Sequence, residues 1–201
     1  EHKQKFKRLN EPDVSYHGVV YTEALGPAAF IGRARVVPLR NMGAAISPFN
    51  AFLILQGIET VTLRMDRICE NTQKVAQFLK DHAKVSWVNY AGLPDHKDHG
   101  LVQKYMGGRA SGILTFGVKS STGDAKAAGA RFQDALQLVV RLVNIGDCKS
   151  LACHPASTTH RQLSAAEMAK AGVSEDMVRL SIGIEHIDDI LADLDRALKA
   201  A

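Results

Sequence analysis

The sequence predicts an α/β domain in which helices cover one face of a sheet, with a long helix and an irregular segment before it. Strand-like and helix-like segments alternate after residue 81, and this alternation is typical of a sheet that packs against helices. Of the 201 residues, 46% are hydrophobic and 23% are charged, the usual composition of a protein that buries a core. We expect one domain over residues 47–201 and an appendage over residues 1–46.

The appendage is interrupted repeatedly by prolines and glycines, which break regular structure. It also holds aromatic residues such as Tyr21 and Phe30, whose large rings favour burial. We therefore expect residues 1–46 to pack against another body, with at most a short helix over residues 27–37.

A long helix is predicted to follow the appendage. Ser47 can cap the free amides of a helix, and Pro48 suits its first position. No further proline occurs before residue 80, and apolar residues recur there at spacings of three and four, as on one face of a helix. At about 1.5 Å per residue such a helix spans roughly 45 Å, so it either links two bodies or kinks near Gly57.

The elements expected after residue 81 follow one another closely. The predicted strands are residues 85–90, 112–118, 139–143 and 178–184. The predicted helices are residues 101–106, 124–137, 164–171 and 187–198. Ser164 and Glu167 form a capping pair that opens the third of these helices. The last helix is the clearest, because Ile190, Leu194 and Leu198 share one face, as in an amphipathic helix.

The charge and the cysteine content narrow the class of protein. The net charge is +4, with basic residues spread along the chain, so we expect no nucleic-acid partner. The chain has neither a long apolar run nor an apolar signal-peptide core, which predicts no membrane segment and a cytoplasmic location. Cys69, Cys148 and Cys153 form an odd and sparse set, which favours reduced thiols over disulfides.

Two polar loops carry residues that can bind a metal. The candidate zinc ligands are Cys148, Cys153, His154 and His160 in the loop over residues 144–160, and His96 and His99 in an earlier loop. Their spacings match none of the common zinc signatures, and the polar setting of the earlier pair indicates a solvated loop. We therefore expect no metal site.

The loop over residues 144–160 also admits a catalytic cysteine. Cys148 or Cys153 would act as the nucleophile beside a histidine or Asp147 of the same loop. The alternative is structural, with the cysteines as small buried hydrophobes and the histidines as hydrogen-bonded loop residues. Both interpretations stay open at this point, because the sequence does not place these side chains together.

Arg179 lies inside the apolar strand segment over residues 177–184, where its neighbours are expected to be buried. A buried guanidinium demands a partner. That partner is either an internal carboxylate or the carboxylate of a ligand, which the planar guanidinium can bind with two parallel hydrogen bonds. The chemistry of the residue alone leaves both alternatives open.

Three ordered blocks carry a resemblance to a known family. They are SPFNAF at residues 47–52 with QGIET at 56–60, HPASTTH at 154–160, and VRLSIGIE at 178–185. Together they resemble the Cys/Met-metabolism family of pyridoxal-phosphate enzymes, nearly from end to end of the chain. Gln56, together with NIGDCKS at residues 144–150, resembles the O-acetylhomoserine sulfhydrylase branch, because other branches usually have arginine for Gln56 and serine for Asn144. Asn41 and Pro38 depart from the family pattern, away from positions expected to touch substrate.

The resemblance implies the carboxyl-terminal domain of a fold-type I pyridoxal-phosphate-dependent transferase. It implies a small, mostly antiparallel sheet with helices on one face, and it makes residues 1–46 the end of the cofactor domain and the linker. The Schiff-base lysine is expected upstream, because Lys5 and Lys7 lie too near the start and Lys149 belongs to another block. Pyridoxal phosphate is thus the implied cofactor of the full-length enzyme, and we expect no catalytic or cofactor-binding residue in this chain.

The implied activity is γ-replacement, in which O-acetylhomoserine and sulfide give homocysteine and acetate. Without the lysine and the amino-terminal cofactor domain, the chain alone is expected to be inactive and to bind no pyridoxal phosphate. Family members are typically homotetramers, so we expect the full-length protein to be one. The alternatives are a cystathionine γ-synthase-like or methionine γ-lyase-like enzyme of the same family, and a standalone α/β ligand-binding module.

The resemblance also implies which residues bind the substrate. Arg179 matches the family's carboxylate-binding arginine, and Asn144 matches a neighbouring position whose backbone or side chain reaches the same carboxylate. We expect the strand to fix the guanidinium, so that the bound amino acid turns its α-proton toward the missing lysine. His154, Pro155 and His160 are expected to shape their loop, with no catalytic role.

Overall fold

The computed structural model describes residues 2–201, except for the side chain of Lys3. The chain divides into two compact units, Glu1–Gly57 and Ile58–Ala201. The division falls within helix α5 (Pro48–Glu59), later in the chain than the boundary expected between residues 46 and 47. That boundary concerns the domains of a full-length protein and stays a prediction.

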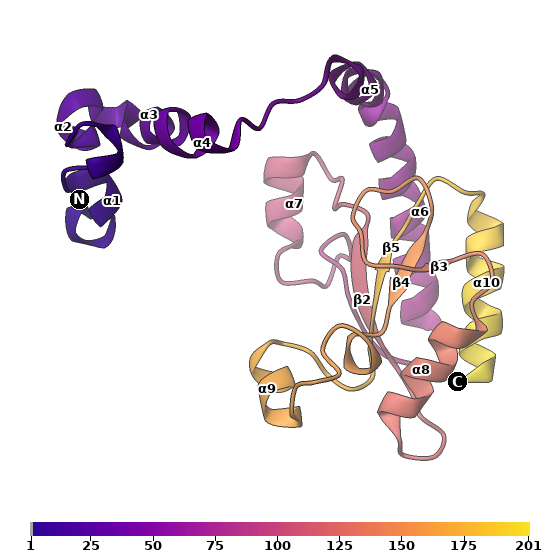
Figure 1. Ribbon diagram of the computed structural model, residues 1–201. Helices are drawn as coiled ribbons and strands as arrows, with labels where there is room; N and C mark the ends of the chain where they lie inside the picture. Colours follow the sequence, from indigo (N-terminus) through magenta and orange to yellow (C-terminus); the bar gives the residue numbers. More distant parts are fainter. Residues whose placement is uncertain (1) are drawn as a thin grey trace. The chain divides into compact units, whose positions relative to one another are not determined.

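The first unit is built from short helical segments. They are η1 (Lys3–Lys5), α1 (Lys7–Asn10), η2 (Val14–Tyr16), α2 (Tyr21–Leu25), η3 (Gly26–Ala28), α3 (Ala29–Ala34), η4 (Arg35–Leu39) and α4 (Arg40–Met42), followed by α5 (Figure 1). Buried Tyr21 donates its hydroxyl to Oδ2 of Asp13 over 3.1 Å, and Nε of Arg33 lies 3.3 Å from the same oxygen. Large apolar side chains such as Phe30 stay exposed, as expected for a segment that cannot bury a core of its own.

The helix expected over residues 27–37 is longer than predicted. The segments α3, η4 and α4 follow one another without interruption from Ala29 to Met42. Pro38 lacks an amide hydrogen and normally ends an α-helix, but it lies in η4, which is a π-helical turn. A widened turn of this kind accommodates the missing donor without ending the helix.

The helix predicted after Ser47, with a possible kink near Gly57, is divided into two helices in the structure. α5 ends at Glu59, and α6 (Val61–Asp81) begins after Thr60, whose ψ of 5° is not helical. The break therefore lies just beyond Gly57, where a kink was expected. The large apolar side chains of α5 are each more than half exposed, and a helix that is apolar on all sides is typical of one surrounded by other protein.

The second unit contains a five-stranded sheet with the order β1-β2-β5-β4-β3. The strands are β1 (Val85–Asn89), β2 (Ile113–Val118), β3 (Val140–Arg141), β4 (Leu151–Cys153) and β5 (Met177–Ser181). Neighbouring strands are antiparallel except β3 and β4, which are parallel. The mostly antiparallel sheet is as expected. The sequence reading missed β4, which lies in the stretch predicted to be a loop.

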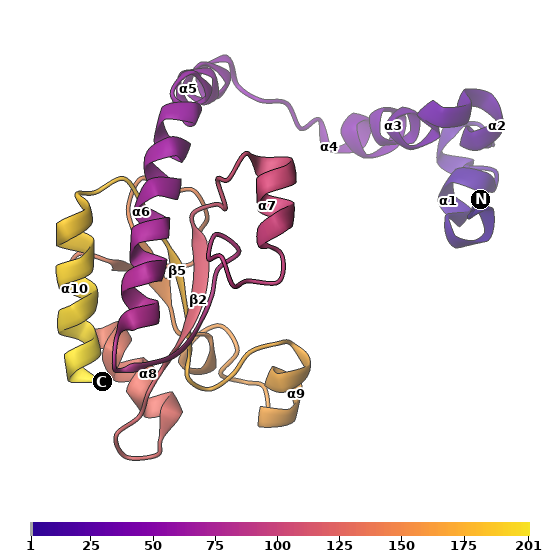
Figure 2. The same cartoon turned by 180° about the vertical axis from the view of Figure 1, so that it is seen from behind.

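Three helices cover one face of this sheet, α6, α8 (Ala125–Ala135) and α10 (Ile187–Ala200) (Figures 1 and 2). The remaining helical segments are α7 (His99–Met106), η5 (Pro155–Ser157) and α9 (Ala165–Lys170). The capping box predicted for Ser164 and Glu167 is present at the start of α9. None of the helices in the described part of the chain is long and apolar enough to span a membrane.

The core lies between the sheet and these three helices. Its members from α6, α8, α10, β2 and β5 include Val75, Leu79, Phe132, Ile190, Leu194, Leu198, Leu114, Phe116, Val178 and Leu180. Buried Asp193 of α10 ties the chain between α8 and β3 to this layer, because its carboxylate accepts the N–H groups of Gln137, Leu138 and Val139 over 2.9 to 3.2 Å. The α/β fold class is confirmed. The three helices lie on one face of the sheet, and they do not cover its other face.

Candidate functional site

Arg179 lies in the middle of β5, opposite Thr115 of β2 on one side and Cys153 of β4 on the other. Its strand neighbours Val178 and Leu180 are completely buried in the core. Because successive side chains of a strand point to opposite faces, Arg179 stands on the face away from the helices. The guanidinium expected to be buried is therefore only half-buried.

The structure brings Arg179 and Asn144 together. Nη2 of Arg179 donates a hydrogen bond to the backbone carbonyl of Asn144 over 3.0 Å. The side chain of Asn144 turns to its own loop, where Oδ1 accepts from the N–H of Ile145 over 2.9 Å. The contact between the two predicted residues is thus made by the backbone, which the identity of Asn144 does not reveal.

Among residues 2–201, no carboxylate forms an ion pair with Arg179. A guanidinium has five N–H donors, and the hydrogen bond to Asn144 uses one of them. The remaining donors suit a planar, two-oxygen acceptor such as a carboxylate. In the described part of the chain, the internal acid that the sequence left open as a partner does not occur.

His154 is completely buried, and both of its ring nitrogens have protein partners. Nε2 lies 2.8 Å from the carbonyl oxygen of Glu175, and Nδ1 lies 2.8 Å from the hydroxyl oxygen of Ser157. A carbonyl only accepts, so Nε2 carries the proton and Nδ1 accepts from the hydroxyl. Cys153, the neighbouring candidate nucleophile, contacts Thr158, with 3.4 Å between Sγ and Oγ1. These contacts favour the structural interpretation of the loop over a cysteine nucleophile.

Burial lowers the pKa of His154, and this predicts a dependence of stability on pH. The unfolded chain takes up the proton near the ordinary pKa, so between the two pKa values it binds more protons than the folded chain. The free energy of unfolding is therefore expected to fall as the pH falls below about 6.5. Urea unfolding of the chain at several pH values should show that His154→Gln flattens this slope relative to the wild type. A slope unchanged by His154→Gln would contradict the assignment.

The metal alternatives find no support in the geometry. Within the described residues, no group of three or more His, Cys, Asp or Glu side chains could hold a metal ion. All three cysteines are free. His96 and His99 are engaged with Asn89 and with the carbonyl of Ala91.

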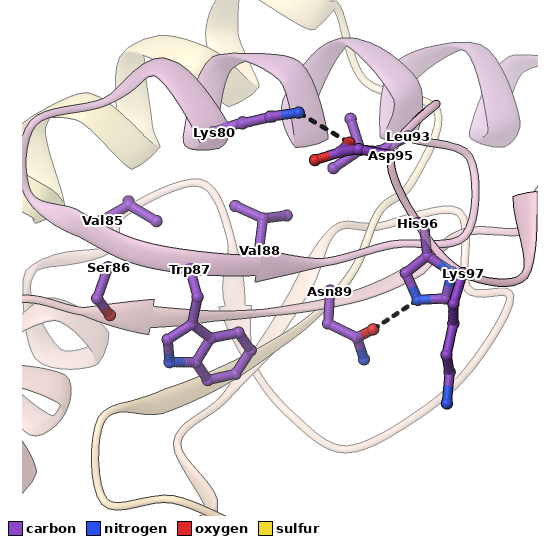
Figure 3. Close-up of a pocket in the computed structure, with 10 residues that line it drawn as sticks. All are labelled: Lys80, Val85, Ser86, Trp87, Val88, Asn89, Leu93, Asp95, His96 and Lys97. Atoms are coloured by element: carbon purple, nitrogen blue, oxygen red, sulfur yellow. Dashed lines mark hydrogen bonds and ion pairs between the residues drawn. The ribbon is translucent and has the colours of Figure 1, made fainter.

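A concavity of about 490 Å³ runs along β1 and was not anticipated from the sequence (Figure 3). Lys80 and Asp95 form an ion pair of 2.8 Å on one side of it, and His96 lies 2.9 Å from Asn89 on the other. β2 separates β1 from β5 in the sheet, so this concavity is distinct from the surroundings of Arg179. The residues that line this concavity come from three separate stretches of chain, and no sequence motif links them.

The concavity that holds Lys5 and Lys7 does not offer a complete site for pyridoxal phosphate. This second concavity of about 490 Å³, in the first unit, is lined by Lys5 and Lys7 together with Phe30 and Arg33. None of its lining residues is an acid that could pair with the pyridine nitrogen or a glycine of a phosphate-binding turn, and both are typical of sites for this cofactor. Lys149 is exposed on its loop. These lysines do not fit the cofactor.

The chain belongs to the family of Cys/Met metabolism PLP-dependent enzymes, whose pattern matches residues 5–199. It is 49% identical over 194 residues to O-acetyl-L-homoserine sulfhydrylase 1 of Thermus thermophilus, and the match covers 96% of this chain and 45% of that protein. The O-acetyl-L-homoserine sulfhydrylase of Leptospira meyeri is 50% identical over 204 residues, with 97% and 45% covered. The family expected from the three sequence blocks is confirmed, and so is the likeness to the sulfhydrylases expected from Gln56 and residues 144–150.

Solved structures agree with this assignment. A protein from Campylobacter jejuni assigned as an O-acetylhomoserine (thiol)-lyase, which carries a pyridoxyl-lysine monophosphate, matches with a TM-score of 0.82 and 41% identity. The O-acetylhomoserine sulfhydrylase of Wolinella succinogenes matches with a TM-score of 0.67 and 37% identity. The matches cover 99% and 89% of this chain, and 46% of each of the two solved chains. The chain therefore spans a little under half the length of these relatives.

Proposed function

We propose that the chain is the carboxyl-terminal part of an O-acetylhomoserine sulfhydrylase and supplies the half of the active site that binds the substrate carboxylate. The observation that carries this proposal is the environment of Arg179. Its guanidinium stands on the sheet face away from the helices, is held by the carbonyl of Asn144, and has no ion pair with any carboxylate among residues 2–201. The donors left over match the two oxygens of an amino-acid carboxylate.

In this proposal the full-length protein consists of this chain preceded by the part that binds pyridoxal phosphate. Sulfide replaces the acetate of O-acetylhomoserine and gives homocysteine, while Arg179 and Asn144 hold and orient the amino acid. We assign the protein to the cytoplasm, where Cys69, Cys148 and Cys153, all unpaired, stay reduced. We also propose that it assembles as a homotetramer.

The experiment that tests this function measures the products formed by the full-length protein loaded with its cofactor. Supplied with O-acetylhomoserine and sulfide, it is expected to release homocysteine and acetate in equal amounts. O-succinylhomoserine with cysteine in place of sulfide tests for γ-synthase activity, and methionine alone tests for lyase activity. A kcat/KM for either of these reactions above that for sulfide and O-acetylhomoserine would contradict the proposal.

A further inference from the structure

We infer that Glu185 is a positioning residue for the substrate-carboxylate site, because it fastens the loop that carries Asn144 to the strand that carries Arg179. The inference rests on the function proposed for Arg179. The inference concerns a residue that does not itself contact the guanidinium of Arg179.

The loop over residues 144–150 connects β3 to β4, and Ser150 at its end is bound by Glu185. The backbone N–H of Ser150 donates to Oε1 of Glu185 over 2.6 Å, and its hydroxyl donates to Oε2 over 2.9 Å. The same hydroxyl accepts the N–H of Gly183 over 2.9 Å. Ser150 is completely buried, so water does not compete for these bonds, and each is stronger than it would be on the surface.

The segment that bears Glu185 is itself held from the other side by α6. Nδ2 of buried Asn71 donates to the carbonyls of Gly183 and Glu185 over 3.1 and 3.0 Å. The N–H of Ile184 donates to the carbonyl of Cys148 over 2.9 Å. The chain that follows β5 is therefore fixed to α6, and the carboxylate of Glu185 in turn holds the end of the loop through Ser150.

The loop lies directly against the chain that follows β5. A Cβ added to Gly183 would stand 2.6 Å from the carbonyl carbon of Lys149, so only glycine permits this approach. With the end of the loop fixed in this way, the carbonyl of Asn144 is held where Nη2 of Arg179 reaches it at 3.0 Å. That bond restricts the orientation of the guanidinium, and a shift of the loop would change the orientation that a substrate carboxylate meets.

The test is Glu185→Gln in the full-length enzyme. A glutamine amide turns two hydrogens toward one of the donors of Ser150, so one of the two bonds is lost. The KM for O-acetylhomoserine is expected to rise about tenfold, while kcat and the KM for sulfide change little. The matched control is Glu167→Gln, because Glu167 accepts the backbone N–H and the hydroxyl of Ser164 over 2.9 and 2.7 Å, in the cap of α9. This control is expected to leave both KM values unchanged.

A double-mutant cycle separates positioning from general stability. In the Arg179→Ala background, Glu185→Gln is expected to raise KM no further, because Glu185 acts through the guanidinium. An equal rise in both backgrounds, or a loss of kcat together with thermal stability, would mean a structural role only and would overturn the inference. If Glu185→Gln yields too little folded protein, Ser150→Ala, which removes the hydroxyl and keeps the backbone bond, is judged by the same criteria.

The outcomes also distinguish the inference from the proposed function. If Arg179→Ala raises KM while Glu185→Gln behaves like Glu167→Gln, the positioning role is overturned and the carboxylate site stands. If Arg179→Ala leaves KM unchanged, the carboxylate site itself fails, and the positioning role fails with it.

Discussion

Replacing Arg179 with alanine in the full-length protein is expected to raise the KM for O-acetylhomoserine by about thirtyfold or more. The variant loses a charge-assisted, two-pronged contact and leaves the substrate carboxylate without its partner. In the proposed role, Arg179 binds the carboxylate equally before and during the reaction, so kcat is expected to fall less than KM rises. Steady-state kinetics with saturating sulfide measure both parameters.

Two variants control this result. Arg179→Lys keeps the positive charge but lacks the planar fork, so its KM is expected to lie between those of the wild type and of Arg179→Ala. Arg131→Ala removes an exposed guanidinium from α8 and should leave KM unchanged. A KM for Arg179→Ala equal to that of Arg131→Ala would defeat the assignment of the carboxylate site.

The chain of 201 residues on its own is expected to show no γ-replacement activity and no saturable imine absorbance when pyridoxal phosphate is added. The concavity that Lys5 and Lys7 share lacks the surroundings that this cofactor needs, since it offers neither an acid nor a glycine turn. A free lysine forms only weak imines with an aldehyde, so any signal should rise in proportion to the cofactor concentration. Titration followed by absorbance, beside the full-length protein, measures the difference.

The control for this titration is Lys149→Ala, which removes an exposed lysine of the loop next to the site. A saturable signal that disappears in this variant, together with homocysteine formation, would mean that the chain carries its own catalytic lysine. A standalone ligand-binding module would instead bind amino acids with no cofactor at all, which calorimetry on the same sample detects.

The elements predicted correctly from the sequence are those whose signal is local. The amphipathic repeat of α10 and the capping box at Ser164 and Glu167 depend only on residues close together in the sequence, and the structure has both. The missed elements depend on distant partners. β4 is only three residues long and exists because β5 and β3 pair with it. Gly57 indicated a possible kink, but the pattern did not show that α5 and α6 separate at Thr60.

The sequence singled out Arg179 and Asn144 as candidate site residues but did not reveal their contacts. Arg179 stood out as a cation in an apolar strand, yet its face of the sheet depends on which residues of β5 the helices cover. Asn144 contacts Arg179 through its backbone carbonyl, which every residue has. Glu185 and Ser150 are far apart in sequence, so no spacing rule joins them, and only the folded chain shows that they meet.

The most direct test is a crystal structure of the full-length protein with a bound amino-acid substrate analogue. The account predicts both carboxylate oxygens within about 3 Å of Arg179, with the carbonyl of Asn144 still on the guanidinium. A guanidinium paired with an internal acid, or an analogue whose carboxylate is held by other residues, would contradict it.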